Sequence, residues 1–401
     1  MSPTSCDHVQ GSREHAAYSA KSMSPILLHG RVLMPQDEFP LASVLIDGER
    51  IAWVREGRID VAGATQMAAD GDTVVPGFID LQVNGFAGHD AAAGPAAMAS
   101  MSESLPRFGV TGFAPTLISR PVGEGVAFIR DCATAGSPGA RVLGAHVEGP
   151  FLNPRFRGAH DSACLVLPTF ENVERFLASP PLLMTLAPEL PGALEAIRAL
   201  TGAGVTVSAG HSGASLSEAQ AGFDAGVRFG THLFNAMVAW HHRNPGLPGA
   251  LLGDDRITVG LIADGVHVDP AMLSVAVKVA GPGRIALITD SVAAAASPPG
   301  RYTIAKREVI SDGTSVRLAD GTLAGSAATM DHLVRVMAGL PGINLRDAVE
   351  MASTTPARAI GIDDRAGCIR PGAPADLVVL DAALQVRLTL IGGRVAYQRG
   401  H

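Results

Sequence analysis

The sequence predicts an α/β protein: a (β/α)8 TIM barrel with a small β-sandwich domain built from both ends of the chain. Eight short apolar runs alternate with Ala- and Leu-rich segments of helical length through the middle of the 401 residues, a pattern typical of parallel βα units. No glycine-rich phosphate turn follows the first run, which favours a closed barrel over an open doubly wound sheet. Hydrophobic residues make up 47% of the chain and charged residues 17%, so a large core can form.

The two ends of the chain share the pattern of a β-meander. Residues 26–54 contain short apolar runs broken by Gly and Asp, and the same pattern returns in residues 375–398. Because the termini of many domains lie close together, both ends are expected to build one domain. We therefore expect a sandwich domain from residues 25–75 and 365–401, and a barrel domain over residues 76–364.

Composition and charge argue against several classes of function. The net charge of −7 makes nucleic acid an unexpected partner. No apolar run reaches the ~18 residues that a membrane span needs, and residues 1–24 lack the apolar core of a signal peptide, so we expect a disordered leader there. The cysteines are scattered without a CxxC pair, which favours free thiols in a reducing cytoplasm: Cys6, Cys132, Cys164 and Cys368.

The eight apolar runs are expected to be the barrel strands, and nearly every run ends in a polar or ionisable residue. The runs span residues 77–84, 112–118, 141–149, 182–189, 204–212, 228–236, 257–265 and 284–292. The carboxyl ends of barrel strands meet at one mouth, where barrel enzymes carry out their chemistry. The residues expected there are Gln82, Asn84, Glu148, Glu189, His211, His232, Asn235, Asp264, His267 and Asp290.

Two of these histidines and one carboxylate have the composition of a catalytic metal site. His211 and His232 end successive strands, and Glu148 would complete a set of three ligands with open positions. His146 competes for the same role, because it lies two residues before Glu148 on the same face of the strand. We favour a deeper barrel layer for His146, although strand spacing alone leaves this choice open.

Asp290 and two loops supply the remaining candidates. Asp290 ends the eighth run, where it could act as a general base beside a metal-activated water; capping of the next loop is the alternative. The loop 148–160 carries His160, which could polarise a carbonyl oxygen. The loop 235–249 carries Arg243, a side chain suited to bidentate recognition of phosphate or carboxylate.

Six motifs occur in the order and approximate spacing of one enzyme family. They are HVEGPFLNPRFRGAH, SAGHS, GTHLFNAM followed by HRNPG, ADGVHV, LITDS and GTLAGSAATM. With these motifs the chain resembles the N-acetylglucosamine-6-phosphate deacetylases of the amidohydrolase superfamily, over roughly residues 26–398. The resemblance implies a metal-dependent barrel with a small β-sandwich from both chain ends, in agreement with the elements above.

The resemblance also implies a role for each matching residue. Glu148, His211 and His232 would hold one divalent metal ion, with zinc expected ahead of iron, cobalt or manganese. Asp290 would act as general base and then general acid, and Ser291 after it departs from the small apolar residue expected there. His160 would contact the substrate amide. The substrate-binding set would comprise Ala159, Asn235, Ala236, Arg243, Asp264, His267, Leu323, Ala324 and Gly325.

The implied reaction is hydrolysis of the acetamide of N-acetyl-D-glucosamine 6-phosphate to D-glucosamine 6-phosphate and acetate. A homodimer or homotetramer is expected, in which Arg243 could act across a subunit interface. The galacto epimer of the substrate remains an alternative. A non-catalytic barrel that binds a sugar phosphate is the rival from a different class.

Gln82 and Asn84 decide how many metal ions we expect. In two-metal relatives the first barrel strand supplies His-x-His, whereas this chain has Gln82 and Asn84 at the same spacing. Neutral amides are weak ligands for zinc or iron. We therefore expect a single metal ion, with both amides forming hydrogen bonds around the site.

Overall fold

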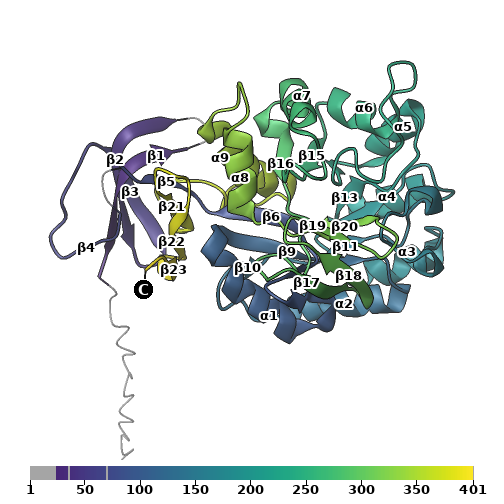
Figure 1. The fold of residues 1–401 in the computed structure, drawn as a ribbon, viewed down its shortest axis with the longest axis horizontal. Coiled ribbons are helices and arrows are strands. Elements are labelled where there is room, and N and C mark those ends of the chain that lie inside the picture. The colour runs from purple at the N-terminus through teal and green to yellow at the C-terminus, as the bar shows by residue number, and fades with distance from the viewer. Residues whose placement is uncertain (1–23, 35–36, 69–70, 401) are drawn as a thin grey trace, which may run out of the picture.

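The computed structural model describes residues 24–34, 37–68 and 71–400, and its two parts lie side by side in Figure 1. The larger part is a barrel of parallel strands surrounded by helices, and the smaller part is a mixed β-sheet made from both ends of the chain. Apart from Ser24, the leader expected over residues 1–24 lies outside the described residues, so it stays a prediction.

Each of the eight apolar runs contains a strand of the barrel, which confirms the predicted fold. The strands pair in parallel in the order β9-β11-β12-β13-β14-β15-β16, and β6 pairs with β9. The third run is split, because β10 (Arg141–Val142) and β11 both pair with β9 along its length. The barrel strands are β6 (Phe78–Val83), β9 (Val110–Ile118), β11 (His146–Glu148), β12 (Leu183–Leu186), β13 (Thr206–Ala209), β14 (Phe229–Gly230), β15 (Thr258–Leu261) and β16 (Ile285–Leu287).

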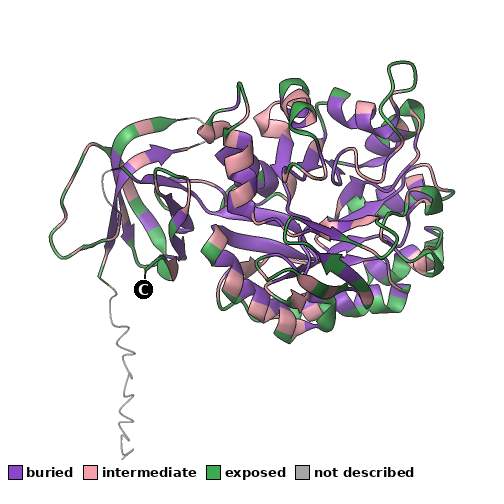
Figure 2. Ribbon diagram, viewed as in Figure 1, coloured by how far each residue is buried: buried purple, intermediate pink, exposed green. Residues whose placement is uncertain are grey.

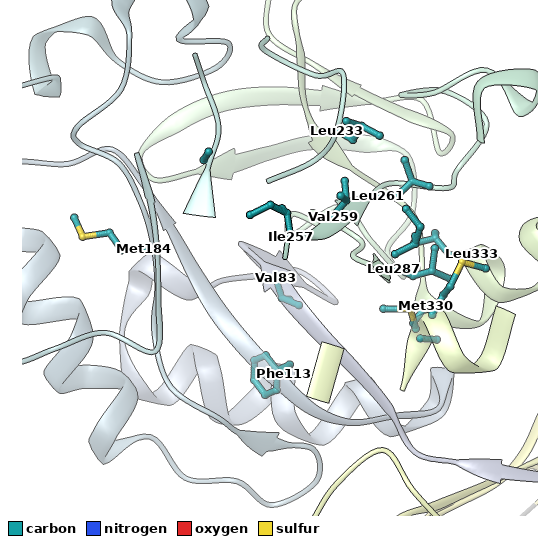
Figure 3. Packing of buried hydrophobic residues seen from close by; sticks show 14 of the residues in the cluster. Val83, Phe113, Met184, Leu233, Ile257, Val259, Leu261, Leu287, Met330 and Leu333 are labelled. Carbon is teal, nitrogen blue, oxygen red and sulfur yellow. The ribbon is translucent and has the colours of Figure 1, made fainter. Parts of the chain in front are cut away.

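Helices cover the outside of the barrel and pack on the outward side chains of the strands. Figure 3 shows part of this layer, where Val259, Leu261 and Leu287 from the strands lie near Leu333 of α8. Among the described residues, no helix is long and apolar enough to cross a membrane. The helices are α1 (Pro95–Ser104), α2 (Val122–Thr134), α3 (Phe170–Leu177), α4 (Ala193–Gly202), α5 (Leu216–Ala225), α6 (Gly246–Gly253), α7 (Pro270–Ala280), α8 (Met330–Ala338), α9 (Leu345–Ala352) and α10 (Thr354–Ala359).

The first and last barrel strands meet at a seam that a few specific contacts close. β6 and β16 form no regular ladder, but Val83 and Ser291 form an isolated parallel bridge just beyond β16. The backbone N–H groups of Asn84 and Gly85 donate to the carbonyl oxygen of Ser291 at 2.8 and 3.1 Å. Both strands are buried along their whole length (Figure 2). The seam is therefore held by the residues that lead into the barrel mouth.

The strands from the two chain ends join in one mixed sheet of eight strands. Its centre is β5, which pairs in parallel with β1 and antiparallel with β21. The sheet rests on the barrel, since Val378 and Val386 pack in the main barrel cluster and the hydroxyl of Thr389 donates to the carbonyl oxygen of Pro106 at 2.7 Å. Its strands are β1 (Ile26–Leu33), β2 (Glu38–Asp47), β3 (Arg50–Glu56), β4 (Thr65–Gln66), β5 (Thr73–Pro76), β21 (Leu377–Leu380), β22 (Val386–Ile391) and β23 (Arg394–Gln398).

A four-stranded antiparallel sheet over residues 300–326 follows β16 and precedes α8 along the chain, and it was not predicted from the sequence. We call it the mouth sheet, because several of its residues line the cavity at the barrel mouth. Its inner face packs on Ile118 and Val292 at the ends of barrel strands. Its strands are β17 (Gly300–Ile304), β18 (Arg307–Ser311), β19 (Ser315–Arg317) and β20 (Leu323–Ser326); a short hairpin of β7 (Gly85–Phe86) and β8 (His89–Asp90) follows β6.

Candidate functional site

A cavity opens at the carboxyl ends of the barrel strands, and most of the predicted site residues line it. Glu148 is the last residue of β11, while His211, His232 and Asp290 follow β13, β14 and β16. The structure thus brings together the three candidate metal ligands, the candidate base and His160. The lining residues are Ile118, Glu148, Gly158, Ala159, His160, His211, His232, Asn235, Ala236, His267, Asp290, Ile304, Thr322, Leu323 and Gly325.

Three of these side chains reach the cavity from backbone in the left-handed region. His211, His232 and Asp290 have φ angles of 49°, 30° and 49°. A residue other than glycine in this region costs of order 1–3 kcal/mol, and it persists only where the surrounding structure enforces it. The strand ends therefore hold strained backbone at the positions that carry the candidate chemistry.

Glu148, His211 and His232 form a compact cluster of ligand atoms. Oε1 of Glu148 lies 2.9 Å from Nε2 of His232 and 3.1 Å from Nε2 of His211. The two Nε2 atoms are 3.0 Å apart. All three residues are buried, and across the described part of the chain no other group of three or more His, Cys, Asp or Glu side chains comes close enough to hold an ion.

The donor atoms of this cluster fit a divalent cation. Nδ1 of His211 donates to the carbonyl oxygen of Phe156 at 2.9 Å, which directs the lone pair of Nε2 toward Glu148. Burial opposes ionisation of Glu148, but the adjoining imidazoles of His211 and His232 outweigh burial and hold the pKa of Glu148 well below the usual range. Two imidazole nitrogens and a carboxylate oxygen are the ligand set of many catalytic zinc sites, which keep a further position open.

His146 lies one layer deeper and has no nitrogen free for a metal. Its Nδ1 is 3.0 Å from the carbonyl oxygen of Leu81 and must donate to it, so the neutral ring accepts at Nε2. The hydroxyl of Thr185 occupies that Nε2 at 2.8 Å. Burial lowers the pKa of His146 to about 4, which keeps the ring neutral. These contacts resolve the choice that strand spacing leaves open, in favour of a barrel-layer residue.

Gln82 and Asn84 direct their amide groups at the carboxylates of the site. Nδ2 of Asn84 donates to Oδ1 of Asp290 at 2.7 Å, and Nε2 of Gln82 is 3.1 Å from both Oδ1 of Asp290 and Oε1 of Glu148. Burial, reinforced by the charge of Glu148, raises the pKa of Asp290 to about 7. A carboxylate with this pKa is suited to take up and release a proton near neutral pH.

The contacts of His160 determine which of its nitrogens faces the site. The backbone N–H of Ser119 donates to Nδ1 of His160 at 3.0 Å, so Nδ1 is an acceptor and the proton of the neutral ring is on Nε2. Burial and the neighbouring His211 hold the pKa of His160 well below its usual range. Nε2 lies 3.8 Å from Oε2 of Glu148. His160 therefore offers an uncharged N–H donor at the candidate metal centre.

His267 lines the cavity, and Asp264 holds it in place. Nδ1 of His267 donates to Oδ2 of Asp264 at 2.7 Å, and the backbone N–H of His267 donates to Oδ1 of Asp264 at 2.9 Å. Burial opposes ionisation of Asp264, but these bonds with His267 prevail and lower its pKa. The ring is thus fixed with its other nitrogen available to a ligand, whereas Asp264 itself is not among the lining residues.

Three further residues expected at the mouth lie apart from the cavity. Ala324 is fully buried in the apolar cluster beneath the mouth sheet. Arg243 is exposed, with Nη1 3.1 Å from Nε2 of His242. The carboxylate of Glu189 connects two loops outside the cavity. It accepts hydrogen bonds from Nδ2 of Asn153 at 2.8 Å and from the backbone N–H of Gly213 at 2.7 Å. Local sequence does not predict these directions, which depend on contacts between distant loops.

Residues 73–396 of the chain match the model of the amidohydrolase family. This chain belongs to that family. Over 93% of its length, this amidohydrolase is 38% identical to an N-acetylglucosamine-6-phosphate deacetylase of Bos taurus, 94% of which is covered. It is 39% identical over 82% of its length to an N-acetylgalactosamine-6-phosphate deacetylase of Escherichia coli O157:H7, 88% of which is covered.

A solved structure of the same kind of enzyme is similar throughout. A mutant N-acetyl-D-glucosamine-6-phosphate deacetylase from Mycobacterium smegmatis, in complex with N-acetyl-D-glucosamine-6-phosphate, matches with a TM-score of 0.89 and 33% identity. The match covers 94% of this amidohydrolase and 100% of that chain. The expected resemblance to the N-acetylglucosamine-6-phosphate deacetylases is thus confirmed.

The mouth sheet adds lining residues to this amidohydrolase that sequence reasoning missed. Ile304 and Thr322 line the cavity, and Arg307 donates to the carbonyl oxygen of Ala159, which connects the mouth sheet to the loop of His160. The backbone N–H of Ala305 donates to Oδ2 of Asp90 at 2.8 Å. The alternation of polar and apolar residues in RYTI was an available, though short, signal for the first strand of this hairpin.

Proposed function

We propose that this amidohydrolase hydrolyses the acetamide of N-acetyl-D-glucosamine 6-phosphate and releases D-glucosamine 6-phosphate and acetate. The observation that carries the proposal is the position of Asp290 beside the cluster of Glu148, His211 and His232, with the N–H of His160 on the same cavity. A non-catalytic binding barrel would have no use for a buried carboxylate held next to a ligand set for a metal.

The three ligands would hold one divalent cation, for which zinc is the first candidate. Such an ion supplies Lewis acidity toward a water molecule and toward the amide carbonyl. Among the described residues no second cluster of His, Cys, Asp or Glu ligands is present, and Gln82 and Asn84 are neutral amides, which are weak ligands for zinc or iron. This arrangement supports a single ion in each chain.

Asp290 and His160 carry the proton transfers and the stabilisation of charge. Asp290 takes a proton from the attacking water, whose oxygen forms a bond to the carbonyl carbon. As the carbonyl oxygen gains negative charge, Nε2–H of His160 donates a hydrogen bond to it. Asp290 then returns the proton to the amide nitrogen, the C–N bond breaks, and the amine and acetate leave.

The phosphate end is assigned to the side of the cavity with His267, Asn235 and Ala236. None of the residues that line the cavity is Lys or Arg, so a phosphate would depend on neutral donors there and on a cation from nearby. Arg243 is the cation expected by resemblance. Its exposed position would allow it to bind the phosphate in the cavity of a neighbouring subunit of a homodimer. A reducing cytoplasm as the location agrees with three unpaired thiols: Cys132, Cys164 and Cys368.

An acetate-release assay tests the proposal. The purified protein, loaded with one equivalent of zinc, is given N-acetylglucosamine 6-phosphate and N-acetylgalactosamine 6-phosphate in parallel. We expect acetate from both, with the larger kcat/KM for the gluco epimer. A larger value for the galacto epimer would move the assignment to the second substrate, which the E. coli relative makes a specific alternative. Binding of sugar phosphate without acetate from either substrate would overturn the proposal.

A further inference from the structure

The seam of the barrel contains a buried carboxylate that has no part in the reaction described above. Asp80 lies in β6 with none of its surface exposed. Its Oδ1 accepts the backbone N–H of Gln82 and the backbone N–H of Thr289, each at 3.2 Å. Its Oδ2 accepts the hydroxyl of Thr289 at 2.6 Å. Both partners adjoin the site, since Gln82 contacts Asp290 and Thr289 directly precedes it.

The bond from Asp80 to Gln82 coincides with a change in side-chain direction along β6. Ile79 and Leu81 pack in an apolar cluster inside the barrel, yet the next residue, Gln82, also reaches the inside and contacts Asp290. In a regular strand, Leu81 and Gln82 would face opposite sides. The pairing of β6 with β9 shifts register just after Asp80. An aspartate that accepts the N–H two residues ahead forms a local turn that competes with regular sheet pairing.

The bonds from Asp80 to Thr289 hold the turn that carries the base. Asp290 is in the left-handed region, with a φ of 49°, and such backbone persists only where its neighbours enforce it. The hydroxyl of Thr289 also accepts the backbone N–H of Ser291 at 3.2 Å. The hydroxyl of Ser291 in turn donates to the carbonyl oxygen of Gly85 at 3.0 Å. One carboxylate thus connects the residues on both sides of Asp290 to the first strand.

We propose that Asp80 is a positioning residue for the hydrolysis, acting through Gln82 and Thr289 to keep the carboxylate of Asp290 in its place beside the metal ligands. The inference rests on the proposed function, in which Asp290 is the base. A displacement of a reacting group by about 1 Å can cost about 100-fold in rate. Asp80 touches neither the cavity nor the three ligands, so its loss should affect the chemical step more than binding of substrate or metal.

Four variants of the zinc-loaded enzyme test this role. Asp80→Ala removes all three acceptor contacts, and we expect kcat to fall about 100-fold with KM changed by less than about threefold. Asp80→Asn keeps Oδ1 and can donate to the hydroxyl of Thr289, so kcat should stay within about fivefold of wild type. Thr289→Val should lower kcat about tenfold. Thr389→Val is the matched control, because Thr389 is equally buried and its hydroxyl also makes one strong bond, but it lies in the mixed sheet.

The control and the conservative variant separate positioning from a general loss of stability. Thermal unfolding should show lower stability for both threonine variants, while only Thr289→Val loses kcat; one zinc ion per chain should remain bound in all variants. Equal loss of kcat in Thr389→Val, or loss in Asp80→Asn as large as in Asp80→Ala, would overturn the inference. If Asp80→Ala does not fold, the two threonine variants decide the matter.

A crystal structure distinguishes failure of this inference from failure of the proposed function. If the wild type releases no acetate from either sugar phosphate, the proposed function fails and kcat is no longer a readout. Crystal structures of the wild type and of Thr289→Val still report the positions of Gln82 and Asp290. Displaced side chains in the variant would support the positioning role, and unchanged ones would overturn it.

Discussion

Asn84 and Asp290 face each other across the seam of the barrel, with Nδ2 of Asn84 2.7 Å from Oδ1 of Asp290. The first strand thus gives the base a neutral hydrogen-bond donor. Burial raises the pKa of Asp290 to about 7, and the hydrogen bond from Asn84 opposes that rise. Burial and the charge of Glu148 thus favour the protonated form of the base, while His232, His267 and the amide of Asn84 favour the ionised form.

Replacement of Asn84 should move the pH dependence of the reaction. The base acts in its ionised form, so kcat/KM falls below its pKa by about tenfold per pH unit. Asn84→Ala removes a hydrogen-bond donor to the ionised form of Asp290 and so raises the pKa of Asp290. As the pH is lowered, the variant should therefore begin to lose activity at a higher pH than the wild type does. Profiles of kcat/KM against pH measure the shift. Ser102→Ala, a buried serine that donates to the carbonyl oxygen of Ala140 far from the site, should leave the profile unchanged.

Removal of the base itself should abolish turnover with little effect on binding. Asp290→Asn keeps the shape of the side chain but cannot accept the proton of the attacking water, and general base catalysis contributes about 10²–10⁴-fold. We expect kcat to fall by at least about 10³-fold while KM stays within a few-fold. Steady-state acetate release gives both constants. Turnover close to that of wild type would remove Asp290 from its assigned role.

The metal content should be one ion per chain. Chelation should abolish acetate release, and one equivalent of zinc should restore it, because only Glu148, His211 and His232 form a ligand cluster among the described residues. His232→Ala should lose most of its bound metal, with the fold retained as judged by circular dichroism. Metal analysis by mass spectrometry measures the stoichiometry. Two ions per chain, with the second in contact with Gln82 or Asn84, would contradict the one-metal site.

Glu189 should stabilise the loop that carries His211. Glu189→Ala leaves three hydrogen-bond donors, from Asn153, Ser212 and Gly213, without their acceptor. We expect the free energy of unfolding to fall by about 2–4 kcal/mol, since a buried donor left unpaired costs about 1–3 kcal/mol and, of the three donors, Ser212 is buried while Asn153 and Gly213 are half-buried. Weaker zinc binding, by about 10–100-fold, should accompany it. Denaturant titration and zinc competition measure the two effects, and Glu195→Ala on the exposed face of α4 is the control.

The sequence was sufficient for the barrel and for the centre of the site. Each apolar run corresponds to a barrel strand, because a buried parallel strand requires a nearly continuous apolar sequence. Glu148, His211 and His232 lie together because the carboxyl ends of the strands converge in any barrel. The directions of side chains beyond the strands were harder to predict. Glu189 ends a run like the others, but three donors from neighbouring loops turn it away from the cavity.

Features that depend on contacts between distant segments escaped the sequence analysis. The mouth sheet is made of short strands with exposed polar residues, so its apolar pattern is weak. The tautomer of His160 depends on the N–H of Ser119, which is 41 positions away in the chain. The place of Gln82 at the end of an apolar run predicted its position at the mouth, but the register shift after Asp80 that accompanies its direction has no signal in the local pattern.

The mixed sheet imposes an order on folding during synthesis. β5 pairs with β21, so a central strand of the sheet needs a partner that is made roughly 300 residues later. At about 5–20 residues per second, the ribosome takes roughly 15–60 s to add that length of chain. Until then the apolar edge of β5 has no antiparallel neighbour, and unpaired edges of this kind are prone to aggregation. The nascent chain should therefore depend on chaperones for most of its synthesis, and premature termination before residue 377 should yield a product that cannot close its own sheet.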